Sequence, residues 1–312
     1  MNQNKLQQLQ NNVEVIGTLK SKELEVKETL DGRRFMSGKL VVQSIVDGKM
    51  NEHNIEVFTA GSSKLFQGVE TVKNEYKTID EHGIESADRI RVKGALKLKE
   101  YYNNEGKLIQ YNIIRGMIFN RLDKDSGLED KAFASIETII ERVKPILEND
   151  LPTGSYSVDG FTVGWKGEVI ELKDVVVEKE LTQAFMDLYQ PGSTGRLSFK
   201  LNSFVEEKKQ VAATTGFGIM VDIKDTFETG NKYTNVITVI GGDMPYLDSR
   251  KYTSKDIETS KQSRRFKLQE MKEKFNISKV PVDNGFGLGI PKQRRITISM
   301  PPGAGNNGIP NF

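Results

Sequence analysis

Residues 89–122 read RIRVKGALKLKEYYNNEGKLIQYNIIRGMIFNRL, and their alternating pattern predicts a long β-hairpin. In the first half of this stretch, apolar or small residues stand at every second position, and basic residues stand at most positions between them. The apolar or small set is Ile90, Val92, Gly94, Leu96 and Leu98, and the basic set is Arg89, Arg91, Lys93, Lys97 and Lys99. This strand runs into Tyr101 and Tyr102, and a second strand starts at Leu108 after a turn at residues 103–106. The basic residues should therefore share one face of the sheet.

A row of cations that ends in aromatic residues suits a groove for single-stranded nucleic acid. The cations would meet phosphates, and the rings of Tyr101, Tyr102 and Tyr111 would stack on bases. Basic residues on one face of an isolated strand are more often simply solvated, so both interpretations stay open for the hairpin alone.

The composition of the 312 residues limits the classes of function. Lys and Arg number 45 and Asp and Glu 43, so the net charge of +2 gives no overall attraction for polyanions, and nucleic-acid binding would depend on local patches. Cysteine is absent, which excludes disulfides, thiolate catalysis and Cys-ligated zinc. The polar start and the lack of a long apolar run predict a soluble, intracellular protein without a membrane partner.

Three strands and a helix are predicted before the hairpin. Alternating apolar positions indicate strands at residues 13–26, 34–46 and 51–59. From residue 65 to residue 76 the apolar spacing becomes helical. Three strands, one helix and two strands are the element order of an OB-fold, which is a small five-stranded barrel. We therefore expect an OB-fold domain at residues 13–122, preceded by a flexible N-terminal arm at residues 1–12.

Three segments of this region carry a family resemblance. They are VEVIGTL at residues 13–19, HNIEVFTAG at residues 53–61 and VKGALKLKEY at residues 92–101. These segments resemble the first, third and fourth strands of bacterial-type single-stranded DNA-binding proteins, which are OB-fold proteins. The resemblance implies that Tyr101 and Phe58 stack on bases, and that His53 stands where the family often has tryptophan.

Residues 123–151 are predicted to form a linker helix. A capping box at Ser126 and Glu129 precedes an apolar stripe with helical spacing. The stripe consists of Phe133, Ile136, Ile140, Val143 and Leu147. We expect this stripe to dock against a neighbouring domain, with a bend near Pro145.

Residues 152–247 are predicted to form a second, diverged OB-like barrel, because strands again surround one helix. The strands expected at residues 218–227 and 233–240 echo the first hairpin, which indicates an internal duplication. A strand expected at residues 196–205 is surplus to this scheme. The second hairpin carries the acidic residues Asp222, Asp225 and Glu228. The first barrel should therefore carry most of the binding.

A charged helix at residues 248–279 and a disordered tail at residues 280–312 complete the prediction. The tail is rich in Gly, Pro and Asn and ends in an apolar tip at residues 308–312. This tip resembles the end with which bacterial single-stranded DNA-binding proteins bind replication and repair partners. The acidic run that precedes the tip in that family is replaced by Lys292, Arg294 and Arg295.

Catalysis is not expected, and neither a cofactor nor a metal is predicted. The motif GAGNNG at residues 303–308 lacks the strand and helix of a dinucleotide site. Neither His53 nor His82 has a metal-ligand spacing. Two carboxylate pairs could hold magnesium, namely Asp222 with Asp225 and Asp243 with Asp248, but such pairs are common on surfaces. Trp165, the single tryptophan, is expected in a core or at a domain interface.

The sequence as a whole favours a mainly β, non-enzymatic protein that binds single-stranded DNA without sequence preference, in DNA replication or recombination. We expect a phage or another mobile element as its source and the cytoplasm as its location. The candidate binding residues are Arg33, Arg34, His53, Phe58, Arg91, Lys93, Lys97, Lys99, Tyr101, Tyr102 and Tyr111. The alternative is a β-barrel assembly or scaffold protein that binds no nucleic acid, and a metal-dependent nuclease is a weaker rival.

Overall fold

The structure is a computed structural model that describes residues 6–206 and 232–279. Its first part comprises β1 (Asn11–Glu28), β2 (Arg34–Val46), β3 (Lys49–Ala60), α1 (Phe66–Glu75), α2 (Ile79–His82), β4 (Arg89–Tyr102) and β5 (Leu108–Leu122). Its second part comprises β6 (Lys131–Glu148), β7 (Leu151–Val163), the 3-10 turn η1 (Trp165–Gly167), β8 (Val169–Val177), α3 (Lys179–Leu188), β9 (Thr194–Glu206), β10 (Lys232–Gly242) and α4 (Ser254–Lys279). The predicted mainly β class is confirmed.

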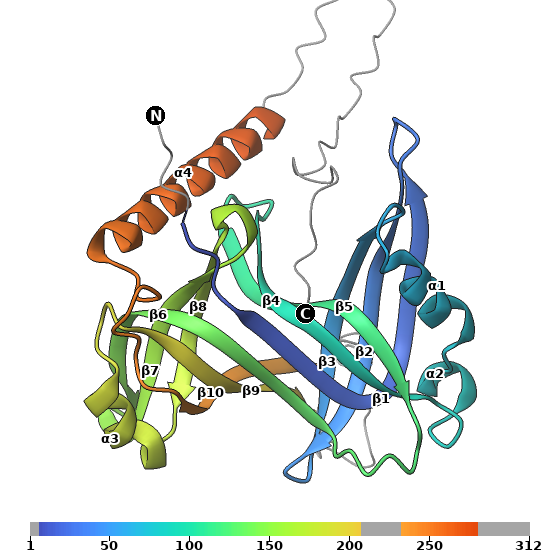
Figure 1. The fold of residues 1–312 in the computed structure, drawn as a ribbon, viewed down its shortest axis with the longest axis horizontal. Coiled ribbons are helices and arrows are strands. Elements are labelled where there is room, and N and C mark those ends of the chain that lie inside the picture. Colours follow the sequence, from blue (N-terminus) through green and yellow to red (C-terminus); the bar gives the residue numbers. More distant parts are fainter. Residues whose placement is uncertain (1–5, 207–231, 280–312) are drawn as a thin grey trace, which may run out of the picture.

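The first five strands pair in a closed cycle. β1 pairs with β2, β2 with β3, and β4 with β5, all antiparallel. β3 runs parallel to β5, and β4 pairs with β1, which closes the cycle. Inward side chains such as Val15, Leu40 and Ile55 are fully buried between these strands. We call β1–β5 with α1 and α2 the first unit, and its element order is the predicted one except for the additional short helix α2 (Figure 1).

The next five strands repeat the same pairing scheme. β6 pairs with β7, β7 with β8, β9 with β10, and β9 with β6, all antiparallel. β8 runs parallel to β10, and α3 follows β8 in the chain as α1 follows β3. We call β6–β10 with α3 the second unit. Because each strand has a counterpart in the first unit, the repeat begins at β6.

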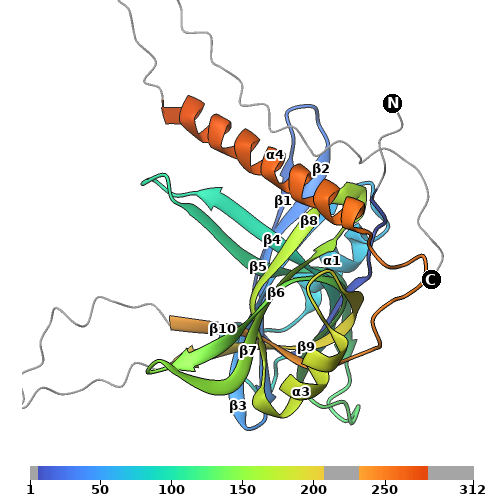
Figure 2. The same cartoon turned by 90° about the vertical axis from the view of Figure 1, so that its left-hand side faces the viewer.

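The two units share strand pairings and a core. β1 pairs with β6 over residues 11–16, and β3 meets β9 at the pair Asn51 and Phe204. One cluster of buried side chains extends from Val13 and Leu96 in the first unit to Leu172 and Phe199 in the second. The units therefore lie side by side with a continuous hydrophobic core (Figures 1 and 2).

The predicted linker helix at residues 123–151 is wrong, because residues 131–148 form strand β6. Ile136 and Ile140 are four residues apart, a spacing that fits one face of a helix and also one face of a strand. Residues 136–140 are all buried, because Ile136 and Ile140 pack in the shared core and Ile139 packs on the other face with Leu9 and Phe161. Its β-branched residues also favour a strand. The contacts with the rest of the chain, rather than the local apolar spacing, therefore determine that residues 131–148 form a strand.

The second hairpin also differs from the prediction. The strand that was surplus at residues 196–205 is β9, the fourth strand of the repeat, and its hairpin partner is β10. The strand predicted at residues 218–227 lies outside the described residues. The second unit therefore begins at residue 131 rather than at residue 152.

The ends of the described chain pack on the second unit. In the segment predicted as a flexible arm, Leu9 is buried and its backbone N–H donates to the carbonyl of Val163 at 2.8 Å. The predicted charged helix is present as α4, although it begins at Ser254. The predicted disordered tail lies outside the described residues. No helix in the described part of the chain is long and apolar enough to cross a membrane.

Candidate nucleic-acid interface

Aromatic rings and guanidinium groups gather on the outer side of β2, β3 and β5. Along β3, Ile55 and Val57 point inward and are buried, so Phe58 points outward and is 40% exposed. The ring of Phe35 on β2 lies 5.5 Å from that of Phe58, and the guanidinium of Arg115 on β5 lies 5.9 Å above the Phe58 ring. We call this surface the outer face. It offers flat apolar rings beside positive charge, which is the combination that stacks bases and contacts phosphates.

The outer face continues along the β4–β5 hairpin. Lys99 stands opposite Tyr111 in the strand register, and Tyr111 is 44% exposed. The carboxylate of Glu56 accepts from Lys99 and lies 3.4 Å from an Nη atom of Arg115. The hydrogen bond to Glu56 raises the pKa of Lys99 above its ordinary value. One carboxylate thus faces two cations, which leaves net positive charge beside the rings.

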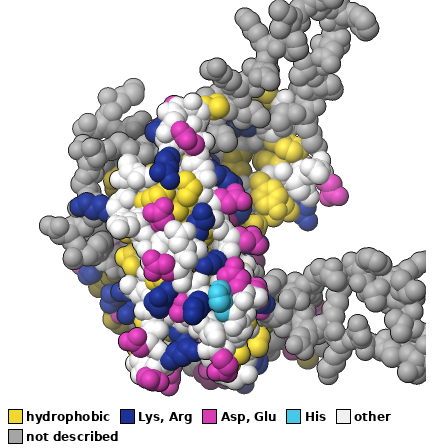
Figure 3. Space-filling view, turned by 90° about the vertical axis from the view of Figure 1, so that its right-hand side faces the viewer, with side chains coloured by type: hydrophobic (Ala, Val, Ile, Leu, Met, Phe, Trp, Pro, Cys, Tyr) yellow, Lys and Arg dark blue, Asp and Glu magenta, His cyan; other side chains and the backbone are white. Residues whose placement is uncertain are grey.

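A groove of about 1030 Å³ adjoins this surface. Glu56, Tyr111 and Ile113 of the first unit line one side, and Lys173 and Asn202 of the second unit line the other. Figure 3 shows hydrophobic side chains gathered on the projecting β4–β5 hairpin beside a hollow, and Lys and Arg mixed with Asp and Glu over the neighbouring face. The groove therefore lies where the two units meet.

Most predicted cations of β4 are engaged by carboxylates from elsewhere in the chain. Arg91 pairs with Glu14 at 2.7 Å, and Lys97 pairs with Glu168 at 2.6 Å. Lys93 is exposed and forms no ion pair with the described residues. Within the described part of the chain, the basic row of β4 is present, but carboxylates pair with each of its members except Lys93.

Two arginines lie at the turn between β1 and β2, at one end of the outer face. Arg33 pairs with Asp31 at 2.6 Å. Arg34 is exposed, and its guanidinium lies 5.9 Å from the centre of the Phe66 ring. Arg34 and Phe35 are adjacent on β2, so their side chains point to opposite faces of the strand, and Arg34 lies against α1 rather than beside Phe58.

The two hairpin tyrosines point to different sides. Tyr101 is 46% exposed and shares its strand face with Lys99. Tyr102 points the other way, and its ring centre lies 5.2 Å from that of Phe275 on α4. The ring of Tyr102 therefore packs against Phe275 of the same chain, and its predicted role in base stacking is not supported.

His53 lies inside the first unit rather than on its surface. The side chain is buried, with Nε2 3.0 Å from Oγ of Ser44. Burial lowers the pKa of His53 to about 4. A ring enclosed in this way cannot reach a base, so the assignment of His53 as a stacking residue is wrong.

This burial predicts a loss of stability in mild acid. Between pH 6.5 and pH 4 the unfolded chain takes up a proton at His53 and the folded chain does not, so the free energy of unfolding falls as pH falls through this window. The loss is on the order of 3 kcal/mol. His53→Gln should remove it while keeping a hydrogen-bonding group near Ser44. Urea unfolding at pH 7 and pH 4.5 measures the difference between the two proteins, and equal acid losses would contradict the assignment.

Phe35 and Arg115 are the binding candidates that sequence reasoning missed. Phe35 stands beside the predicted Arg34, and Arg115 lies on the returning strand of the quoted hairpin. Neither forms part of a local motif. The antiparallel register of β2 and β3 brings Phe35 to Phe58, and the parallel register of β3 and β5, which pairs Glu56 with Arg115, brings Arg115 there.

Trp165 and the carboxylate pairs also differ from expectation. Trp165 is 61% exposed, so the prediction of a core position is wrong. Asp243 pairs with Arg196 and Asp248 with Arg250, while residues 222 and 225 lie outside the described ranges. Among the described residues, no group of three or more His, Cys, Asp and Glu side chains has a metal-holding arrangement.

Comparisons with known proteins give one family and several structural resemblances. The model of the family described as YorF matches residues 10–274. A search of curated proteins finds no match. The wild-type single-stranded DNA binding protein from Thermus aquaticus is 12% identical, with a TM-score of 0.48 over 80% of this chain and 99% of that chain. The Plasmodium falciparum SSB in complex with ssDNA is 17% identical, with a TM-score of 0.26 over 36% of this chain and 96% of that chain.

Proposed function

The chain belongs to the YorF family, and we propose that it binds single-stranded DNA on the outer face of its first unit. The observation that carries this proposal is the Phe35–Phe58 ring pair with Arg115 beside it and Tyr111 further along the same face. Exposed rings beside cations are the combination that binds single strands, and stacking on bases is sequence-tolerant because every base has a π-face.

The strand order supports the choice of this face. We interpret each closed cycle of five strands as an OB-like barrel, the second beginning at β6. In OB-folds, the surface of the second and third strands binds oligonucleotides or oligosaccharides, together with the loops after the first and fourth strands. Here those strands carry Phe35 and Phe58, and those loops carry Arg33 and the tip of the β4–β5 hairpin.

The proposed path of the DNA follows from the positions of the rings and the positive charges. Bases stack on Phe35, Phe58 and Tyr111, each worth about 1–3 kcal/mol on comparable platforms. Phosphates lie near Arg115, and the DNA continues into the groove against the second unit. Arg33, Lys93, Lys99 and Tyr101 supply further contacts within reach of this path.

This activity suits a non-enzymatic role. We place the protein in DNA replication or recombination in the cytoplasm, as the product of a phage or mobile element, with replication or recombination proteins as partners of its C-terminal tail. Single strands in such processes must be held without regard to sequence, which stacking and phosphate contacts achieve.

Fluorescence anisotropy with labelled oligo-dT, a matched RNA and a duplex tests the proposal. We expect binding to oligo-dT that is tighter than binding to the duplex and weakens as salt rises, because phosphate contacts release counterions. Failure to bind any of the three would overturn the proposal.

A protein-assembly module is the second candidate, because the cations of β4 are already paired with carboxylates. Under that function the exposed rings of the outer face meet another protein. Stable oligomers without nucleic-acid binding, detected by light scattering beside the anisotropy measurement, would favour it.

Glu56→Gln should strengthen the binding of single-stranded DNA. Removing this carboxylate frees Lys99 and Arg115 for phosphates, so we expect about three- to tenfold higher affinity and a steeper dependence on salt. Glu129→Gln makes the same change of charge on the exposed loop between β5 and β6 and should leave both quantities unchanged. Equal effects of the two variants would show that only the overall charge matters.

A further inference from the structure

The β4–β5 hairpin projects from the first unit, and its far end is held by other parts of the chain (Figure 2). A two-stranded ribbon is marginally stable at best on its own, so its direction depends on what it touches. Tyr111 and Ile113 lie on this ribbon and line the groove. The position of the ribbon therefore determines the shape of the proposed binding site.

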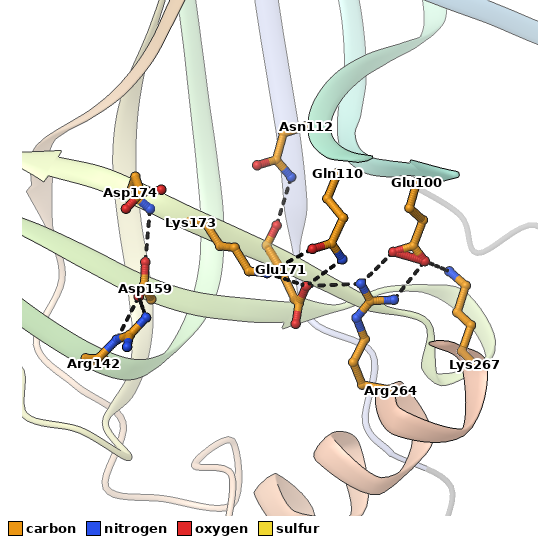
Figure 4. A network of polar contacts seen from close by, with 10 residues as sticks. All are labelled: Glu100, Gln110, Asn112, Arg142, Asp159, Glu171, Lys173, Asp174, Arg264 and Lys267. Carbon is orange, nitrogen blue, oxygen red and sulfur yellow. Dashed lines mark hydrogen bonds and ion pairs between the residues drawn. The ribbon is translucent and has the colours of Figure 1, made fainter. Parts of the chain in front are cut away.

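Arg264 of α4 joins the ribbon to the second unit (Figure 4). Its Nη1 donates to Oε1 of Glu100 on β4 at 2.7 Å, and its Nη2 donates to Oε2 of Glu171 on β8 at 3.0 Å. Lys267, one turn further along α4, lies 3.2 Å from Glu100. One guanidinium thus bridges two strands that belong to different units.

Arg264 is buried, unlike the other Lys and Arg side chains of α4 whose burial is described. Arg264 is 5% exposed, and among the described residues it is the one buried Lys or Arg. Burial alone would raise the pKa of Glu100, but the guanidinium of Arg264 holds it below the ordinary value. Charges are buried only at considerable cost, and this cluster remains ionised because each member is paired.

Three further contacts hold the hairpin in the same position. The ring of Phe275 near the end of α4 lies beside Tyr102, at the tip of β4. On β5, the side-chain amide of Asn112 donates to the carbonyl of Glu171 at 2.9 Å, and Lys173 donates to Gln110 at 3.1 Å. The ribbon is thus fastened to α4 on one strand and to β8 on the other.

We propose that Arg264 is a positioning residue, which fixes the β4–β5 hairpin against the second unit so that Tyr111 faces the groove. Phe275 assists it at the tip. The inference rests on the proposed binding of single-stranded DNA for its functional part, whereas the fastening of the hairpin stands on the contacts alone.

Two variants of the full chain test the proposal, each with a matched control. Arg264→Gln breaks the bridge, and Arg265→Gln changes the neighbouring arginine, which is exposed and pairs within α4 with Glu258. Phe275→Ala removes the ring at the tip, and Phe266→Ala removes an exposed ring from the same helix. If Arg264→Gln fails to fold, Phe275→Ala still tests the fastening, since it leaves the buried charges paired.

Hydrogen exchange without DNA gives the first measurement. We expect the amides of residues 98–112 to exchange at least about tenfold faster in both test variants, while the other strands of the first unit keep their rates. The controls should behave as the unmodified protein. Unchanged exchange in the hairpin of both test variants would overturn the proposal.

The dissociation rate of labelled oligo-dT gives the second measurement. We expect dissociation about tenfold faster in the test variants, because a loosely held β4–β5 hairpin must be ordered each time the oligo-dT binds. Faster exchange with an unchanged dissociation rate would overturn the positioning role. If the unmodified protein binds no oligo-dT while the exchange result holds, the proposed function fails and the fastening of the hairpin remains.

Discussion

Replacing Phe58 and Tyr111 together with alanine is expected to weaken the binding of oligo-dT by about 30-fold or more. Each ring that stacks on a base contributes about 1–3 kcal/mol, and two such losses combine to at least this change. Both rings are partly exposed on the outer face, so the fold should survive their removal. Anisotropy titration at fixed salt measures the effect, and thermal unfolding checks the fold.

Phe266→Ala provides the matched control for this pair. Phe266 is 65% exposed on α4, away from the outer face, and its loss should leave the affinity unchanged. If the double variant binds as tightly as the unmodified protein, the single-stranded DNA binds elsewhere on the molecule.

Gly94→Ala should destabilise the protein by about 3 kcal/mol or more, which is large for the addition of one methyl group. Gly94 pairs with Gly116 where the register between β4 and β5 shifts. A Cβ atom at this position would lie 2.1 Å from the carbonyl oxygen of Arg115, so the backbone would have to move. Urea unfolding measures the loss.

Gly68→Ala on α1 is the control of opposite sign. No atom lies within 4 Å of the added methyl group, and alanine favours a helix by up to about 1 kcal/mol over glycine. A loss at Gly94 no larger than the change at Gly68 would show that the close approach of β4 and β5 is not rigid.

The parity of residues along β3 explains why Phe58 lies at the surface and His53 lies inside the first unit. His53 and Phe58 are five positions apart, and residues separated by an odd number point to opposite faces of a strand. The family resemblance suggested both positions without testing whether they share a face. Strict use of the alternation would have placed His53 inward with Ile55 and Val57.

The element order of the first unit was predictable because each strand carries its own alternating pattern. The helix predicted over β6 was wrong because residues 136–140 are buried on both faces of the strand, so the apolar residues do not alternate strictly. Local spacing cannot reveal such burial. It depends on the shared core on one face and on the cluster around Leu9 and Phe161 on the other.

The ion pairs that neutralise β4 could not be foreseen from the hairpin. The carboxylates on Arg91, Lys97 and Lys99 come from Glu14, Glu168 and Glu56, which lie far away along the chain. Likewise, Tyr102 is covered by a helix that begins at Ser254. The exposed rings and their neighbouring cations emerge only when the strands are in register.

Photo-crosslinking with a single-stranded oligonucleotide that carries 5-iodouracil tests the central claim most directly. After irradiation and digestion, mass spectrometry identifies the peptides attached to the oligonucleotide. We predict crosslinks in residues 34–39 and 54–60, which lie on β2 and β3 of the outer face, and in residues 109–115 of the β4–β5 hairpin. Crosslinks confined to α4 or to the far side of the second unit, with none on β2, β3 and β5, would contradict the account.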